Sequence, residues 1–428
     1  MDAGGLLGSL IALLLGLAIG KAWERYKLQD GRWLDRRRAR ESPHYMLGLN
    51  FLVANQIDPA IEELTRAAQA AGDPLEIQLI LGNLYREKGQ VGPAIQTHQA
   101  LLQRPNLRKL EHANVLLCLG LDYKRGGFVD RALEAFTEVL RLDAENVYAL
   151  SNLEKLYEEQ HQWHEAYATR LKLSRRDGQS AETKHQQILA FLENELGLQA
   201  LKRMDYADAV RRFEAAIELD PSNTPAYLNL GDVRFLQAET AGATATWERL
   251  IETSPDRAYL AFPRLEAAYS KDGDSSRFPE LCRRLIADNP QDWRARLALA
   301  RHLSARDSSP PGAPQGRAEQ TRRPTDVGSD TRAALDLLFE ALVHNPHALA
   351  LHQTIWHTLS QLGLPASLVN QYVDLTRDAI FYVDPHICIR CRYRSTELLW
   401  QCPHCHEWNT FIEERIAPAK DTEATLST

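Results

Sequence analysis

Cysteine is scarce along most of this sequence: only Cys118 and Cys282 precede residue 388 in a chain of 428 residues. Both stand at apolar positions of helical patterns, where buried small hydrophobic side chains are expected. Positive charge is not in excess either, because the formal net charge of −7 gives no electrostatic reason to expect nucleic-acid binding. The chain also lacks a nucleophile–base motif, a glycine-rich phosphate loop and an H-E-x-x-H metal motif. These absences favour a binding protein over an enzyme.

Three histidines in the helical patterns stand alone. His112, His161 and His185 have no partner at metal-ligand spacing, and we predict solvated helix positions for them. Apolar residues make up 44% of the chain and charged residues 25%, a balance typical of a protein that folds, with room for two or three domains. Leucine, alanine, glutamate and arginine are frequent, which favours helix.

The N-terminus carries a long apolar run. Residues 3–20 read AGGLLGSLIALLLGLAIG, with Ser9 as the only clearly polar side chain. This length is close to the ~20 residues that cross a bilayer core as a helix. Only Asp2 precedes the run and basic residues follow it, which predicts a cytoplasmic location for the rest of the chain and an outside N-terminus. A cleaved signal peptide would carry its basic segment ahead of the run. We therefore predict a transmembrane anchor at residues 1–20 and a basic juxtamembrane linker at residues 21–42.

A pattern of small and large residues then repeats along the chain, and its first copies, at Gly48 and Gly82, are 34 residues apart. The repeated positions are Gly48, Phe51 and Ala60; Gly82, Tyr85, Gly89 and Ala94; Gly120, Tyr123, Gly127, Ala132 and Phe136; Tyr157 and Ala166; Gly197, Ala209, Phe213, Ala216 and Pro221; and Gly231, Ala243, Trp247 and Pro255. Small residues are needed where two helices of a hairpin cross closely, and proline ends the second helix. This is the tetratricopeptide signature.

The repeats predict an all-α superhelical solenoid over residues 43–380. Each helical hairpin cannot bury its own apolar stripe, so neighbouring hairpins stack and leave an extended concave surface suited to peptides or proteins. Residues 305–330 are rich in proline, glycine, serine and arginine, and we predict a disordered insertion there, between the two helices of the last full repeat.

Four cysteines gather close to the end of the sequence in the spacing C-x2-C-x10-C-x2-C, and they are Cys388, Cys391, Cys402 and Cys405. Two such pairs make a tetrahedral four-sulfur site for Zn²⁺ or a single iron. A cytoplasmic location disfavours disulfides, and a redox motif would need only one pair. A closed site of four protein ligands indicates a structural role for the metal. We favour one zinc ion, with iron as the alternative.

The metal would supply the folding energy of a small rubredoxin-like or zinc-ribbon domain at residues 381–416, followed by a disordered tail at residues 417–428. Trp400 and Trp408 are expected to pack around the metal site. Three nearby histidines are expected at the surface or behind the ligands, since four cysteines already complete the tetrahedron. They are His386, His404 and His406.

The order of these parts, with "YMLGLNFLVANQIDPAIEELTRA", "LGNLYREKGQVGPAIQTHQALL", "LGLDYKRGGFVDRALEAF" and "YRSTELLWQCPHCHEWNT", resembles the bacterial lipopolysaccharide assembly protein B family. The resemblance implies a single-pass inner-membrane protein that regulates lipopolysaccharide synthesis. It implies three kinds of partner: a membrane-bound AAA+ protease, the deacetylase that commits precursor to lipid A, and lipopolysaccharide synthesis and export proteins. It also implies a knuckle that packs on the repeats.

Two features depart from that family. Arg392 follows the second cysteine where such knuckles usually have glycine, and the insertion is longer than expected. The leading hypothesis is a non-enzymatic membrane adaptor. The alternatives are an electron-transfer protein with iron at the four cysteines, and a generic tetratricopeptide co-chaperone that captures peptide C-termini. Whether the chain forms a homodimer is left open.

Overall fold

The structure, a computed structural model, describes residues 42–70, 74–105, 107–177, 182–308, 329–376 and 386–414, together with Leu17, Lys21 and Gly72. The chain divides into two units, Met1–Leu173 and Ser174–Thr428, which are described separately. The predicted anchor, nearly all of the basic linker and the predicted tail lie outside the described residues. Within the described residues, no helix is both long enough and apolar enough to cross a membrane.

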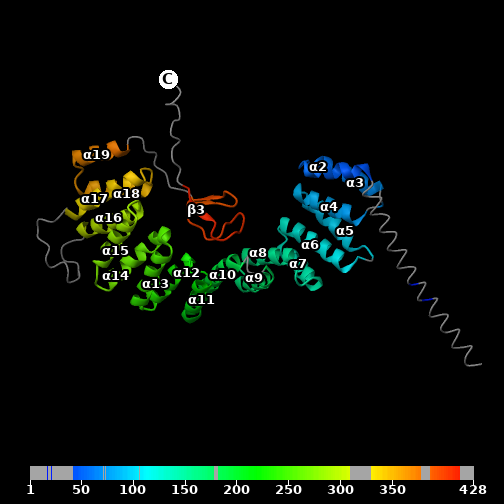
Figure 1. The fold of residues 1–428 in the computed structure, drawn as a ribbon, viewed down its shortest axis with the longest axis horizontal. Helices are drawn as coiled ribbons and strands as arrows, with labels where there is room; N and C mark the ends of the chain where they lie inside the picture. Colours follow the sequence, from blue (N-terminus) through cyan, green and yellow to red (C-terminus); the bar gives the residue numbers. More distant parts are fainter. Residues whose placement is uncertain are drawn as a thin grey trace, which may run out of the picture. The chain divides into compact units, whose positions relative to one another are not determined.

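The first unit consists of antiparallel helical hairpins in which consecutive helices lie side by side (Figure 1). Its helices are α2 (Pro43–Val53), α3 (Ile57–Ala70), α4 (Leu75–Glu87), α5 (Val91–Leu102), α6 (Lys109–Arg125), α7 (Val129–Leu142), α8 (Val147–Glu159) and α9 (Trp163–Asp177), whose last residues belong to the second unit.

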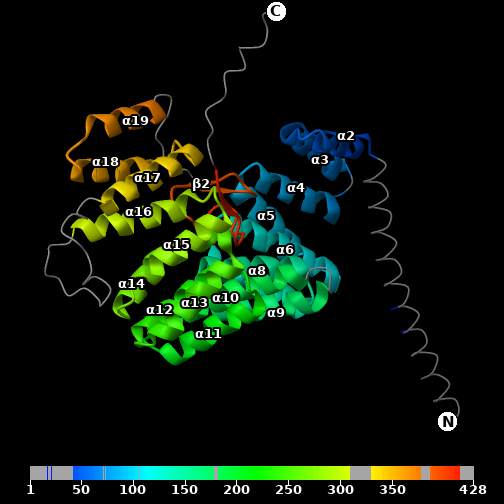
Figure 2. The ribbon, with the colours of Figure 1, turned by 60° about the vertical axis from the view of Figure 1, so that its left-hand side comes forward.

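The second unit continues the same pattern (Figure 2). Its helices are α10 (Glu182–Lys202), α11 (Tyr206–Leu219), α12 (Thr224–Leu236), α13 (Thr240–Thr253), the 3₁₀ helix η2 (Pro255–Leu260), α14 (Phe262–Lys271), α15 (Arg277–Asp288), α16 (Trp293–Ser308), α17 (Ser329–His344), α18 (Leu349–Gln361) and α19 (Ala366–Thr376). Helices α16 and α17 each extend into the ends of the predicted insertion, whose residues 309–328 lie outside the described part. The prediction of a helical tetratricopeptide solenoid is confirmed.

The small residues of the repeat lie where helices cross, as the sequence predicts. A Cβ atom on Gly120 would approach Phe136 Cε1 to 2.6 Å, and one on Gly197 would approach Phe213 Cε1 to 2.5 Å. Real Cβ atoms do not come so close, because dense packing leaves no room for overlap. In both hairpins the aromatic ring of the second helix therefore occupies the space that a side chain on the first helix would need.

Turns inside the hairpins require a left-handed backbone. Gly89 and Gly127 provide it with φ of 80° and 73°, at no steric cost. His161 takes the same left-handed conformation, with φ of 55°, in the exposed turn after α8. The prediction of a solvated helix position is therefore wrong for His161, which lies in a turn. It is also wrong for His185, which is buried in α10.

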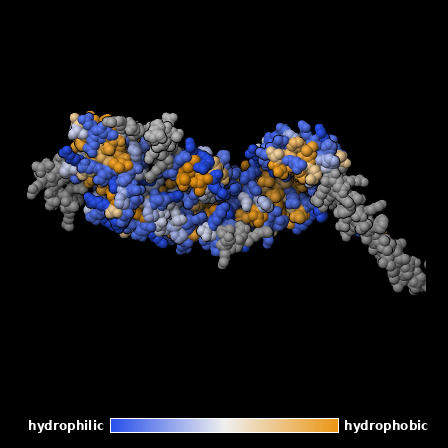
Figure 3. Space-filling model, turned by 45° about the horizontal axis from the view of Figure 1, so that its top comes forward, coloured by the Kyte–Doolittle hydropathy of each residue, from blue (hydrophilic) through white to orange (hydrophobic). Residues whose placement is uncertain are grey.

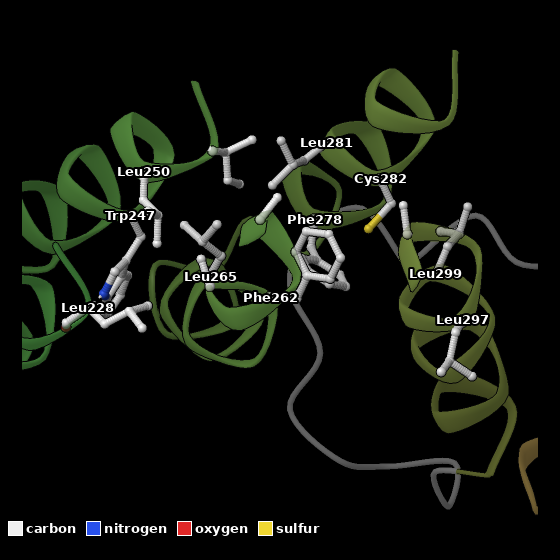
Figure 4. Close-up of a cluster of buried hydrophobic side chains, with 14 of the residues drawn as sticks. Leu228, Trp247, Leu250, Phe262, Leu265, Phe278, Leu281, Cys282, Leu297 and Leu299 are labelled. Atoms are coloured by element: carbon white, nitrogen blue, oxygen red, sulfur yellow. Dashed lines mark hydrogen bonds between the residues drawn. The ribbon is translucent and has the colours of Figure 1, made fainter. Parts of the chain in front are cut away.

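The core of the second unit runs continuously through its helices. Figure 4 shows Trp247, Phe262 and Phe278 from successive helices, with Cys282 beside Leu281. Cys282 is fully buried, as predicted, and burial raises the pKa of its thiol to about 12. Cys118 in the first unit is only half-buried.

A small antiparallel sheet follows the helices. It consists of β1 (His386–Cys388), β2 (Arg394–Ser395) and β3 (Phe411–Glu413), in the order β2-β1-β3. We call residues 386–414 the knuckle. Apolar side chains of the second unit reach the surface on the knuckle, at Ile389 and Ile412, and near α18 and α19, at Trp356 and Val373 (Figure 3).

Candidate metal centre

The two cysteine pairs of the knuckle form the same backbone turn. In the first, the Arg392 N–H donates to the Cys388 carbonyl oxygen at 2.9 Å, and the Cys388 N–H donates to the Tyr393 carbonyl oxygen at 2.9 Å. The second pair repeats both bonds around Cys402, at 2.9 Å and 3.0 Å. Because the backbone repeats, the two turns present their sulfur atoms in the same way.

Each turn places the residue after its second cysteine in the left-handed region. Arg392 has φ of 64° and His406 has φ of 55°. Glycine is favoured at such positions because a Cβ atom crowds the following carbonyl oxygen. The arginine that departs from the family pattern is therefore accommodated, with its side chain exposed, in a turn that keeps its hydrogen bonds.

The four cysteine sulfurs converge on one point. Cys388 Sγ lies 3.7 Å from Cys405 Sγ, and Cys391 Sγ lies 3.5 Å from Cys402 Sγ. All four sulfurs lie within 4.8 Å of one another. Four thiolates at ~2.3 Å from a tetrahedral ion would be about 3.8 Å apart, so the spacing fits a single Zn²⁺ or iron.

The surroundings of the four sulfurs favour the thiolate form at Cys388. Burial raises the pKa of the Cys388 thiol, but hydrogen bonding with the Thr410 hydroxyl and with the backbone N–H groups of Cys391 and Arg390 outweighs burial and lowers it to about 6. Burial raises the pKa of Cys405 to about 12, with the neighbouring sulfurs acting in the same direction. A divalent cation would remove this difference by holding every sulfur as thiolate.

The knuckle has a small hydrophobic cluster of its own. Phe411 is buried against Cys388 and Cys402, and Leu398 and Leu399 pack beside them. Thr410 Oγ1 lies 3.2 Å from Cys388 Sγ, which ties β3 to the sulfur cluster.

Aromatic and charged contacts join the knuckle to the helices of the second unit. Trp408 stacks on Phe191 of α10, with ring centroids 5.3 Å apart and planes at 16°. Arg257 of η2 lies over the Trp400 ring, 5.2 Å from its centroid. On α16, Arg294 makes an ion pair with Glu413.

The contacts correct one expectation and agree with another. Trp400 and Trp408 were expected around the metal site, but both rings pack on the solenoid, and Phe411 and the two leucines surround the sulfurs instead. The knuckle packs on the repeats, as the family resemblance implies. Phe191, Arg257 and Arg294 carry no local signal in the sequence, because each becomes a docking residue only through a contact far along the chain.

The four cysteines would complete the coordination of one tetrahedral ion, so no further protein ligand is needed. Across the described ranges, the four cysteines are the group of side chains placed to hold a metal ion, and the three nearby histidines lie elsewhere. His404 is exposed and stacks on Tyr393, whereas His386 and His406 are half-buried. A tetrahedral ion with four thiolates has no open position for substrate, so such a site stabilises structure.

Comparison with known families agrees with this description. Residues 386–413 match the rubredoxin metal-binding domain, and residues 200–269 match the tetratricopeptide repeat. The chain is therefore a helical tetratricopeptide solenoid with a small C-terminal metal-binding knuckle. A solved tetratricopeptide repeat protein from Parabacteroides merdae is similar over 67% of this chain and 98% of its own, with 14% identity and a TM-score of 0.31.

The particular resemblance extends along nearly the whole sequence. Lipopolysaccharide assembly protein B of Escherichia coli (strain K12) is 24% identical over 405 residues, which cover 94% of this chain and 97% of that protein. The protein of the same name from Haemophilus influenzae is 24% identical over 430 residues, covering 97% of this chain and 99% of its own. The resemblance to the lipopolysaccharide assembly protein B family, drawn from the sequence, is confirmed.

Proposed function

We propose that this protein is a non-enzymatic scaffold in lipopolysaccharide assembly. The observation that carries the proposal is the similarity to proteins of that name over 94% of the chain, from the first repeats to the knuckle. A tetratricopeptide solenoid supports a scaffold role, because stacked hairpins provide an extended surface for binding other proteins.

The scaffold acts at the inner membrane, anchored by residues 1–20, with its repeats in the cytoplasm. It brings the deacetylase that commits precursor to lipid A to a membrane-bound AAA+ protease, and it gathers lipopolysaccharide synthesis and export proteins. The apolar run and the basic residues after it support the anchor. Anchoring raises the local concentration of membrane partners around the repeats, which favours their encounter.

The four cysteines hold one Zn²⁺ in this proposal, and the ion's role is to fold the knuckle. The sulfur spacing and the closed ligand set support a structural ion. Metal analysis of the purified protein is expected to give one zinc per chain without colour. One iron per chain with a reversible redox signal would instead make the knuckle an electron-transfer centre.

A test in cells shows whether the protein regulates the level of the deacetylase. In cells that lack the chromosomal gene, the full chain is expected to restore the normal, low level of the deacetylase, measured by immunoblot. A version without residues 1–20 is expected to fold but to leave the deacetylase level high. Full regulation by this shortened chain would rule out the anchor's role, and an unchanged deacetylase level on deletion of the gene would rule out the proposed regulation.

A further inference from the structure

A cavity of about 620 Å³ lies between the knuckle and the helices of the second unit. Its solenoid side is largely aromatic and aliphatic, with Phe262, Phe278 and Leu297 on successive helices (Figure 4). His386 and Glu413 of the knuckle line the opposite side. This volume lies within the usual range for ligand pockets, ~300–1,000 Å³, and an apolar pocket with few polar groups is the usual form of a binding site.

Three of the charged groups in the cavity already have polar partners. Arg294 pairs with Glu413 and lies over the Tyr259 ring, 4.3 Å from its centroid. Glu266 lies 2.6 Å from the Nδ1 atom of His302. These side chains are held in place by their partners and are not free to neutralise a ligand.

Arg301 is different. In the described part of the chain its one polar partner is the Thr354 hydroxyl, to which Nε donates at 3.2 Å, and no carboxylate pairs with it. Partial burial lowers the pKa of Arg301, as expected for a cation that loses water without gaining an anion. A carboxylate from a ligand would give the Arg301 guanidinium an ion-pair partner, because guanidinium groups bind carboxylates through paired hydrogen bonds.

We propose that the cavity binds an extended peptide segment of a client protein. A large apolar side chain of the peptide fills the space between Phe278 and Leu297, and an adjacent aspartate or glutamate pairs with Arg301. The identity of the ligand as a client rests on the proposed scaffold function. Since Glu413 and His386 form one wall, peptide binding also depends on the fold of the knuckle and therefore on its metal.

The chain's own C-terminal segment is the competing occupant. Residues 415–428 begin two positions after Glu413 and contain Asp421, Glu423 and Leu426. Removal of this segment distinguishes the two, because a client site keeps its affinity whereas a site filled by the segment gains affinity.

The test uses purified full-length protein and an array of immobilised eight-residue peptides. Each peptide combines one phenylalanine, leucine or serine with a neighbouring aspartate, lysine or serine. Peptides with phenylalanine or leucine beside aspartate are expected to retain the protein most strongly. Arg301→Glu is expected to weaken them at least tenfold and to shift preference toward lysine, and Ala350→Trp, which fills the cavity, is expected to weaken all apolar peptides.

Arg283→Glu, an exposed arginine on α15, is the matched control and should bind as the wild type does. No retention, an unchanged aspartate preference in Arg301→Glu, or tenfold tighter binding after removal of residues 415–428 would each overturn the proposal. The scaffold function fails separately: if Arg301→Glu loses peptides while deletion of the gene leaves the deacetylase level unchanged, the cavity stands and the cellular role does not.

Discussion

The helices of the second unit and the knuckle beside them stabilise their folds by different means. The helices share one buried apolar core that extends from Ala190 to Tyr372. The knuckle has Cys388, Cys402 and Phe411 as the buried members of its own cluster. A core that small cannot balance the conformational entropy lost on folding, whereas stacked repeats gain stability from each neighbour. The same unit thus combines a fold maintained by packing with one that we expect to need a metal.

Removal of the metal gives the largest expected effect. A structural Zn²⁺ contributes an apparent ~10–16 kcal/mol, so Cys402→Ser is expected to unfold the knuckle while the helices keep their circular-dichroism signal. Zinc release, measured with a colorimetric chelator, should fall from one equivalent to almost none. Cys118→Ser, outside the cluster, should keep the metal. A knuckle that stays folded without metal would remove the contrast between the two regions.

Truncation of a repeat aromatic tests the other side of the comparison. Trp247 is buried beneath Gly231 in a helix crossing of the second unit, so Trp247→Ala is expected to destabilise that unit by about 3–5 kcal/mol. Urea unfolding followed by circular dichroism measures the change, and the metal content should stay at one equivalent. Trp356→Ala, at a half-exposed ring, should change stability by less than about 1 kcal/mol. Equal effects at the two sites would contradict the core assignment.

In one repeat of the first unit, polar and charged side chains replace the buried aromatic ring at the helix crossing. His98 takes the position of the aromatic beneath Gly82 and is fully buried, where it contacts the carboxylate of Asp122. Arg86 donates to the same carboxylate at 2.8 Å. Asp122→Ala is expected to cost about 2–3 kcal/mol in urea unfolding, because two polar partners lose their acceptor. His98→Phe restores an aromatic crossing and should cost less; a larger loss would show that the charged network is needed for packing.

These two helix crossings also show which structural features the sequence predicts and which it does not. The period and the small residues predict the hairpins, because both follow from local spacing. They do not predict that Asp122 would meet His98, since that contact joins two hairpins. The cysteine spacing likewise predicts which four sulfurs meet. It is silent about Phe191 and Arg257, whose partners Trp408 and Trp400 lie far away in the chain.

Loss of one docking ring should separate the regions without unfolding either. The stack of Trp408 on Phe191 is expected to contribute about 0.5–1.5 kcal/mol beyond the area it buries. A double-mutant cycle with Phe191→Ala and Trp408→Ala measures this energy from thermal unfolding. Metal content should be unaffected, and faster amide exchange should appear across β1 and β3. Additive effects of the two substitutions would mean that the stack does not hold the knuckle in place.

The smallest expected change is a gain in the stability of the knuckle. Arg392 occupies a left-handed position with its side chain exposed, so Arg392→Gly relieves steric crowding in the first cysteine turn. Glycine also gains freedom in the unfolded chain, which offsets part of the relief, and the net stabilisation is expected to be about 0.5–1 kcal/mol. Slower zinc loss to a chelator, compared with the wild type, measures it. Arg394→Gly, on β2 with an ordinary backbone, is the control and should not slow zinc loss. If Arg392→Gly releases zinc faster instead, the arginine stabilises the turn through its side chain, and the knuckle depends on more than its metal and its backbone.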